Sequence, residues 1–441
     1  MESSGYDRVV GITSGAPRRR RDADRELSEE LKRAHEATDA RLAAEKTDEL
    51  APPADDGSVR SRGEFADSAP EDELPGGMAV LMVNERPTFD NEPGFVLKGQ
   101  CCALCGPLET AEPYEGPPLE LGDLMTENGQ LSAEIQEVMQ YWSESMAELI
   151  IWLYRCKGRH PSNFRLVIWD NTGYHIPWEL FWLKDPPEQD PGWLGALLTV
   201  TRWLTPRDER QGRDYWRAYR CEGPVAAYVD EGMDAHLDLL AALFDRVRRS
   251  PSMTQLADYL DVPQPDPLSL VYVACEGRFD DEAVGSGLGD LPLASASRFR
   301  RLRKPAQTLI FLNAAYSGAV GISRRRFRHP AVQRGFAHAF LQNGAVGVLA
   351  ISARVEPGDT YRLADDLLAY LKKHRDKPVA DALRELRYEA WRASRCEPEH
   401  ALVPSEAAGQ QPGDQGIPAL YRFMYVYYGS PFTVLAIPGG S

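Results

Sequence analysis

The amino-acid sequence predicts an α/β protein built on a mainly parallel sheet flanked by helices. Two apolar runs carry this prediction, LSLVYVACEG at 268–277 and TLIFLNAAYSG at 308–318, because each is rich in Val, Leu, Ile and Phe and stops at small residues and a glycine. Such a run is typical of a buried parallel strand that ends in a loop. Helix-like segments alternate with strand-like runs, as βαβ units require. Ligands and chemistry sit at the carboxyl edge of such a sheet.

Length and composition narrow the class of protein. The 441 residues are enough for about two or three domains with a sizeable core. No apolar run reaches the roughly 18 residues that span a bilayer, and the N-terminus has no secretory apolar segment, so we expect a cytoplasmic protein without a membrane partner. A net charge of −16 argues against nucleic-acid binding. Seven cysteines do not indicate a disulfide framework.

The front of the chain divides into two predicted regions. Residues 1–77 should be largely disordered, with one surface helix at 24–50 and an acidic, Pro- and Ser-bearing linker at 52–75. Residues 78–130 should form a small β unit, because the β-leaning runs 79–83 and 95–105 are separated by a turn-rich segment.

The second of these runs carries a CxxC pair. Cys102 and Cys105 form the pair, and Cys101 lies beside it. Metal binding needs a second pair of ligands, and no matching CxxC or HxxxH occurs elsewhere in the chain. We therefore interpret these cysteines as thiols of a half-buried strand, and we expect neither a metal nor a cofactor.

Residues 131–441 should form the main domain, led by one long helix at 132–156. Its apolar side chains recur at i, i+3 and i+4, and Ser132 suits the N-cap. An exposed loop is expected at 396–416. The other predicted elements are strands at 165–169, 197–201, 225–229 and 345–351, helices at 235–248, 331–343, 358–373 and 378–394, and a closing strand pair at 422–429 and 432–437.

One short segment after the strand at 165–169 has two interpretations. Pro177 suits the first position of a short helix, and Glu179 falls in its first turn, where the helix dipole favours an anion. The carboxylate is then structural. Beside Trp178, it could instead form the wall of a pocket.

Five segments also match a known family in chain order. They are IPWELF at 176–181, VYVACEG at 271–277, FLNAAYSG at 311–318, VQRGFAHAFLQNGAVGVLAISARV at 332–355 and YVYYGSP at 425–431. With them, residues 165–437 resemble the CHAT-domain family of caspase-like peptidases. The second and third look like the family's strands ending in Ala-Cys-His-Gly and Asn-Ala-Cys-x-Ser-Gly. The first and last look like its Pro-Trp-Glu segment and its terminal Tyr-Gly-Asp-Pro.

The resemblance implies a caspase-like sheet and a cysteine endopeptidase, often part of a prokaryotic defence or programmed-death system. It places the catalytic His at the first strand tip and the catalytic Cys at the second. This sequence departs from the family at both, with Glu276 and Ala315. The residues expected to line the cleft are Gly277, Asn313, Ser317, Gly318, Trp178, Glu179 and Asp280.

The two departures decide the expected chemistry. Peptide cleavage of this kind needs a thiolate and an imidazole that protonates the leaving amine. Ala315 has no nucleophile, and a carboxyl with an ordinary pKa of about 4.3 cannot supply the proton at pH 7 unless burial raises that pKa. Cys275 should point to the opposite face of its strand. Another histidine could lie close to the site in three dimensions; the candidates are His175, His329 and His338.

Three functions remain open from the sequence. The first is a catalytically inactive pseudoprotease that binds a peptide or a protein partner of the same system, with Glu276, Asp280 and Asp281 facing a basic side chain. The second is a cysteine endopeptidase whose nucleophile has been substituted or comes from elsewhere. The third is a hydrolase or nucleotide binder that uses Asp280, Asp281 and Asp290, although GSGLGD lacks the spacing of a phosphate-binding loop.

Overall fold

The chain divides into two units, Met1–Asp67 and Ser68–Ser441, and every element below belongs to the second. The predicted helix at 24–50 lies outside the described residues, as does nearly all of the linker 52–75 and of the loop 396–416. The computed structural model describes residues 74–90, 92–116, 133–162, 164–172, 174–184, 191–204, 217–262, 267–279, 286–296, 299, 302, 307–319, 321–323, 332–396 and 419–438.

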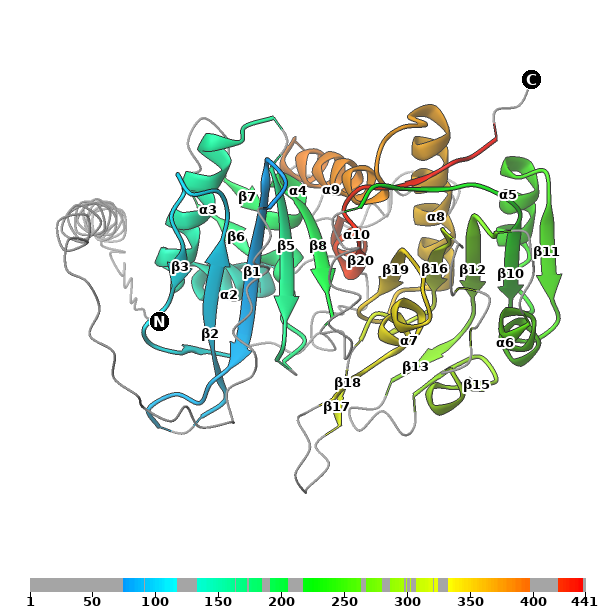
Figure 1. Cartoon of the computed structure of the whole chain (residues 1–441), viewed down its shortest axis with the longest axis horizontal. Helices are drawn as coiled ribbons and strands as arrows, with labels where there is room; N and C mark the ends of the chain where they lie inside the picture. The colour runs from blue at the N-terminus through cyan, green and yellow to red at the C-terminus, as the bar shows by residue number, and fades with distance from the viewer. Residues whose placement is uncertain are drawn as a thin grey trace, which may run out of the picture. The chain divides into compact units, whose positions relative to one another are not determined.

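One large sheet organises the second unit, and it confirms the predicted fold class (Figure 1). Its strand order is β11-β10-β12-β16-β19-β20-β8-β5-β1-β2-β3, with β4 paired to β2. The strands are β1 (Met78–Glu85), β2 (Gly94–Gln100), β3 (Leu108–Glu109), β4 (Tyr114–Glu115), β5 (Arg165–Asp170), β8 (Thr199–Trp203), β10 (Val225–Val229), β11 (Val247–Ser250), β12 (Leu270–Ala274), β16 (Leu309–Asn313), β19 (Gly347–Ile351) and β20 (Tyr425–Gly429).

Two parallel blocks meet in this sheet. Strands β11, β10, β12, β16 and β19 are parallel neighbours, and so are β8, β5 and β1. Strand β20 joins the blocks, because it pairs antiparallel with β19 and, through Tyr428 and Arg202, parallel with β8. The sheet is therefore mainly parallel, with one strand from late in the sequence at its middle.

The predicted boundary at residue 130 is not a boundary in the structure. Strands β1 and β2 form the expected antiparallel hairpin. However, β1 also pairs in parallel with β5 over six residues, from Met78 opposite Arg165 to Val83 opposite Asp170. The described strands of this unit, β1 to β4, are therefore part of the main sheet.

Two predicted helices differ from the structure. The helix expected at 132–156 is two helices, α2 (Ala133–Glu144) and α3 (Ala147–Arg159). The hydroxyl of Ser145 donates to the carbonyl of Trp142 at 2.6 Å, a bond that competes with the helical ladder at the break. The helix expected at 235–248 ends at Leu243 as α5 (Ala235–Leu243), and Val247 begins β11.

The prediction that the two closing strands pair with each other is also wrong. Strand β20 follows a short helix, α10 (Ala419–Met424), and pairs inside the main sheet. The last strand, β21 (Thr433–Leu435), pairs instead with β9 (Tyr219–Cys221). Three further small pairings lie outside the main sheet: β6 (Trp182–Leu183) with β7 (Gly192–Trp193), the trio β13 (Gly277–Arg278), β14 (Gly287–Leu288) and β15 (Leu291–Pro292), and β17 (Gly321–Ser323) with β18 (Val332–Arg334).

Helices cover both faces of the block that contains β12, so its central strands are buried on both sides. Alternate residues of β12 divide between two cores: Leu270, Tyr272 and Ala274 face one, and Val271 and Val273 face the other. The first core receives α2, α3, α5, α8 (Pro357–Lys373) and α9 (Val379–Cys396). The second receives α6 (Met253–Asp261) and α7 (Phe336–Gln342). The predicted helices at 331–343, 358–373 and 378–394 correspond to α7, α8 and α9.

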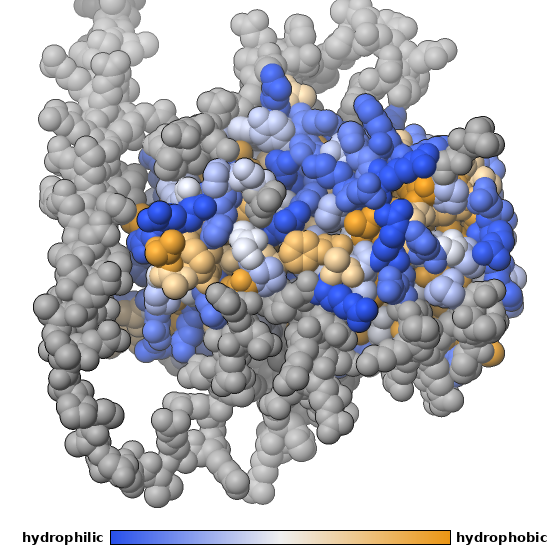
Figure 2. Space-filling view, turned by 45° about the horizontal axis from the view of Figure 1, so that its top comes forward, coloured by the Kyte–Doolittle hydropathy of each residue, from blue (hydrophilic) through white to orange (hydrophobic). Residues whose placement is uncertain are grey.

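Hydrophobic residues on the surface are dispersed. On the face drawn in Figure 2 they form separate groups among hydrophilic residues. The large hydrophobic side chains that are most exposed belong to four different segments: Phe89, Leu104, Tyr141 and Val262. Among the residues that the structure describes, no helix combines the length and apolarity needed to cross a bilayer.

Candidate functional site

The tips of β12 and β16 lie side by side, as the two apolar runs predict. Their parallel register places Ala274 opposite Asn313, so Glu276 and Ala315 stand two residues beyond matched positions. The loops touch at Gly277, where an added Cβ would lie 1.9 Å from the carbonyl oxygen of Ala315. Only glycine permits this approach of two backbones. The structure therefore brings the strand tips that carry Glu276 and Ala315 to one place.

Glu276 is exposed, and its backbone is held by a second carboxylate that the sequence analysis missed. The amide of Glu276 donates to Oδ2 of Asp230 at 3.2 Å, and its carbonyl accepts from the amide of Gly289 at 3.0 Å. Asp230 in turn accepts a hydrogen bond from the hydroxyl of Tyr228. The signal in the sequence was the position of Asp230 directly after β10, at the neighbouring strand tip.

Ala315 and Tyr316 form the matching tip of β16, and both are partly exposed. Tyr316 has φ = 56°, a left-handed conformation that is uncommon for a residue with a Cβ. Its amide donates to the carbonyl of Ala353 at 3.2 Å, which fixes this turn against the loop after β19. Such backbone outliers concentrate at functional sites. The side chain presented there by Ala315 is a methyl group.

Ser317 and Gly318 are buried and hold the shape of the loop. The Ser317 hydroxyl donates to the carbonyl of Leu312 and accepts from the amide of Ile351, both at 3.1 Å. The amide of Gly318 donates to the carbonyl of Ile351 at 2.8 Å, and its carbonyl accepts from the hydroxyl of Tyr428 at 2.7 Å. Their polar groups are thus used within the fold.

Asn313 lies beneath the site in a buried polar network. Its amide nitrogen donates to the hydroxyl of Tyr272 at 3.1 Å and to the carbonyl of Thr360 at 3.0 Å, and its oxygen accepts from the hydroxyl of Tyr425. The Tyr272 hydroxyl also contacts Nδ1 of His236 at 2.7 Å. Because Asn313 is only 1% exposed, its side chain supports β16 from inside the core.

This network makes the stability of the fold depend on pH through His236. Burial lowers the pKa of His236 to about 4, against 6.5 for an ordinary histidine. The unfolded chain therefore takes up the proton first, so the contribution is complete above pH 6.5 and is lost as the pH falls toward 4. We expect the free energy of unfolding to drop by about 3 kcal/mol across this window. Urea unfolding of the natural chain and of His236→Gln at pH 7.0 and 4.5 measures this, and an equal drop in both proteins would contradict it.

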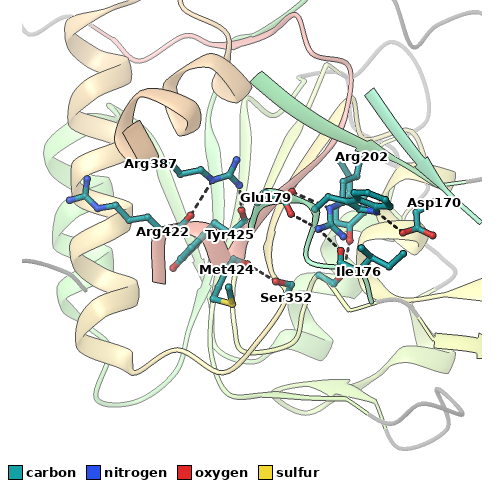
Figure 3. Close-up of polar contacts among 12 residues, drawn as sticks. Asp170, Ile176, Glu179, Arg202, Ser352, Arg387, Arg422, Met424 and Tyr425 are labelled. Carbon is teal, nitrogen blue, oxygen red and sulfur yellow. Dashed lines mark hydrogen bonds and ion pairs between the residues drawn. The ribbon is translucent and has the colours of Figure 1, made fainter. Parts of the chain in front are cut away.

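Trp178 and Glu179 lie in the interior. The indole of Trp178 is fully buried and donates to Oδ2 of Asp170 at 2.9 Å. Glu179 is 2% exposed and forms an ion pair with Arg202, whose guanidinium also donates to the carbonyl of Ile176 at 3.1 Å (Figure 3). Of the two interpretations of this segment, the geometry favours the structural one, because both side chains are used inside the core.

A third buried charge lies close to this pair. Arg387 of α9 donates to the carbonyls of Arg422 and Tyr425, the latter at the start of β20 (Figure 3). A Cβ added at Gly195 would lie 3.0 Å from Glu179 and 3.2 Å from Arg387, so both line the same small space. Burial lowers the pKa of Arg387 to about 10, and the charge of Glu179 opposes this shift. Glu179 therefore balances two buried arginines at the junction of the two blocks.

Thiols and imidazoles near the strand tips are few among the described residues. Cys275 is 2% exposed in the second core, as alternation predicts, and burial raises the pKa of its thiol. His175 approaches the loop after β12, since its ring lies 5.3 Å from that of Phe279. His338 is buried in α7.

The remaining predicted acidic residues divide into two groups. Asp280 and Asp281, like His329, lie outside the described residues. Asp290 caps the start of α6, where its Oδ1 accepts from the amides of Met253 and Thr254 at 2.8 and 3.2 Å. That role accounts for its carboxylate without a nucleotide or a metal.

Comparison with known proteins gives one family. The CHAT domain family matches residues 233–430. Among solved structures, the Saccharomyces cerevisiae separase–securin complex is similar at 13% identity and a TM-score of 0.38, over 64% of this chain and 17% of that chain. A structure described as that of a protease is similar at 10% identity and a TM-score of 0.43, over 66% and 69% of the two chains.

This chain thus spans about a sixth of the separase chain that it matches. No curated protein matches it. The region matched by the family contains β12, β16 and the loops that meet at Gly277 and Ala315. The part of the chain that contains both strand tips, residues 233–430, is therefore similar to the CHAT domain family.

Proposed function

We propose that this protein is a catalytically inactive CHAT-domain protein that binds a peptide segment or a protein partner at the tips of β12 and β16. One observation carries the proposal: the backbones of Gly277, next to Glu276, and Ala315 approach closely, and the two positions that resemble the family's catalytic pair, Glu276 and Ala315, hold an exposed carboxylate and a methyl group. Neither can act as a nucleophile or as an imidazole acid in peptide cleavage.

The arrangement of the tips suits recognition. Glu276 presents a negative charge in the open, and Asp230 holds its backbone in place. The left-handed turn at Tyr316 keeps Ala315 at the surface beside it. A basic side chain of a bound segment would meet the carboxylate of Glu276, while the methyl group leaves room for its backbone. On the family resemblance, our proposal includes a partner from a prokaryotic defence or programmed-death system and a location in the cytoplasm.

The first test is an assay for peptide cleavage. The purified protein should leave a peptide library intact, with or without candidate activators. Cleavage that a cysteine-directed inhibitor abolishes would reject the proposal of inactivity.

The second test addresses binding. Fluorescence anisotropy with labelled Arg- and Lys-rich peptides should show binding that weakens about tenfold in Glu276→Gln, because one charge-assisted contact is lost. Glu389→Gln, an exposed glutamate of α9, is the matched control and should bind like the natural chain. Equal peptide affinities for all three proteins would show that Glu276 does not take part in binding.

A second candidate function is an endopeptidase whose nucleophile has been substituted. The intact contact between Gly277 and Ala315 favours it, because the scaffold would still align a dyad. Ala315→Cys should then cleave peptides, and Ala315→Cys with Glu276→His should cleave faster. If the folded double variant remains inert, this candidate fails and the binding proposal stands.

A further inference from the structure

We propose that Cys101, Cys102, Cys105 and His160 form a structural zinc site outside the CHAT domain. The four side chains offer three sulfur atoms and one nitrogen, and these donor atoms all lie within 4.8 Å of one another. Three cysteines and one histidine are a common ligand set of structural zinc. Sulfur and imidazole ligands also disfavour magnesium and calcium, which prefer oxygen.

The distances fit a tetrahedral ion. Bonds of about 2.3 Å to sulfur and 2.0–2.1 Å to nitrogen place neighbouring donors about 3.5–3.8 Å apart. The sulfurs of Cys102 and Cys105 are 3.3 Å apart, and Nε2 of His160 lies 3.4 Å from the sulfur of Cys102. A disulfide needs about 2.05 Å, so the pair is placed as two ligands would be.

Hydrogen bonds hold two elements together at this point. The three cysteines occupy the turn after β2, which the amide of Cys105 closes by donating to the carbonyl of Cys102 at 3.0 Å. His160 caps the end of α3. Arg155 of α3 donates to the carbonyl of Cys105 at 3.0 Å, and Trp152 donates to that of Gly106 at 3.1 Å. The turn is therefore already fixed to the helix that supplies the fourth ligand.

A fourth thiol supports the same assignment. Cys156 precedes His160 by four residues, so both lie on one face of α3. Cys156 is fully buried, and its thiol interacts with those of Cys101 and Cys105. A buried S–H beside two thiolate ligands is the kind of outer partner that orients them.

A catalytic Cys–His pair explains this cluster less well. Cys102 and His160 alone would be enough for such a pair, and a nucleophilic thiol needs an open approach. Here the thiol of Cys102 contacts both His160 and Cys105, and Cys101 converges on the same point. Zinc uses all four donors. Because Cys102 and His160 are each partly exposed, solvent can deliver the ion.

Metal analysis of the full chain tests the proposal. Protein purified without chelators should contain one equivalent of zinc by elemental analysis. Cys102→Ser and His160→Ala should each lower the content at least tenfold. Cys221→Ser, which removes a buried thiol of β9, is the matched control and should retain the metal. Zinc-free natural protein, or variants that retain the full equivalent, would overturn the proposal.

A second measurement keeps the test valid if a variant fails to fold. The natural chain, stripped and loaded with Co²⁺, should show a thiolate-to-cobalt charge-transfer band and the visible absorption of tetrahedral cobalt. His160→Cys supplies a sulfur ligand in place of nitrogen, so it should bind cobalt with a shifted spectrum. Octahedral cobalt without thiolate bands, or a Cys102–Cys105 disulfide in the purified protein, would also overturn the site.

Discussion

Replacing Glu179 by glutamine should lower the free energy of unfolding by about 3–5 kcal/mol. The cause is the charge of Arg202, which is then left buried without its counter-ion while Arg387 lies close by. Equilibrium unfolding in urea measures the loss. The variant of a surface pair is the control: Glu109→Gln breaks the Lys98–Glu109 contact, whose glutamate is 72% exposed, and should cost less than about 1 kcal/mol.

The paired replacement separates a lost attraction from an unpaired charge. Glu179→Met with Arg202→Met removes both charges and keeps apolar volume, so it should recover part of the stability lost by Glu179→Gln, with Arg387 left as the unbalanced charge. If the double variant is as unstable as the sum of its single variants, the ion pair is not the reason for the loss.

Trp178→Ala should destabilise the fold by about 3–5 kcal/mol, as the removal of a large buried aromatic side chain does. The indole has no exposed surface, and its ring centre lies 6.1–6.2 Å from those of Phe95, Trp142 and Phe181. These rings belong to β2, α2 and the segment after η1 (Trp178–Leu180), so one cavity weakens three elements. Thermal unfolding followed by tryptophan fluorescence measures the effect.

Tyr141→Ala is the matched control, because this aromatic residue of α2 is 81% exposed and its loss should change stability by less than about 0.5 kcal/mol. Peptide binding decides whether Trp178 belongs to a ligand site. Trp178→Phe, which keeps a ring in the core, should bind peptide like the natural chain. A selective loss of affinity in that variant would show that Trp178 belongs to the ligand site.

The sequence predicts the centre of the fold well, because buried parallel strands leave an unambiguous pattern. The two runs ending at Gly277 and Gly318 correspond to β12 and β16, and their neighbours β10 and β19 are also found where expected. Pairing over long distances is less visible. Nothing in the residues 425–429 indicates that β20 lies between β19 and β8, since a buried strand has the same composition wherever it is inserted.

For the candidate site, the sequence identifies the residues but not all of their roles. Residues on the strand tips, Glu276 and Ala315, could be named from the sequence. Ser317 and Asn313 could be named too, but their roles could not, because polar side chains look the same whether they face a ligand or a buried backbone group.

The cysteine cluster was harder to recognise. A search for a second CxxC or HxxxH passes over Cys156 and His160, although their spacing places a thiol and an imidazole on one side of a helix. The spacing was visible in the sequence, but the docking of that helix against the cysteine turn was not.

The position of β20 sets the order in which the molecule can be completed. Residues 425–429 follow every other strand of the main sheet in the sequence, yet they occupy its middle. As synthesis proceeds from the N-terminus, β8 and β19 each keep one unpaired edge until these five residues emerge from the ribosome. Two half-sheets must therefore avoid pairing with foreign strands during that interval. Strand β20, the last strand of the main sheet to be synthesised, then joins them.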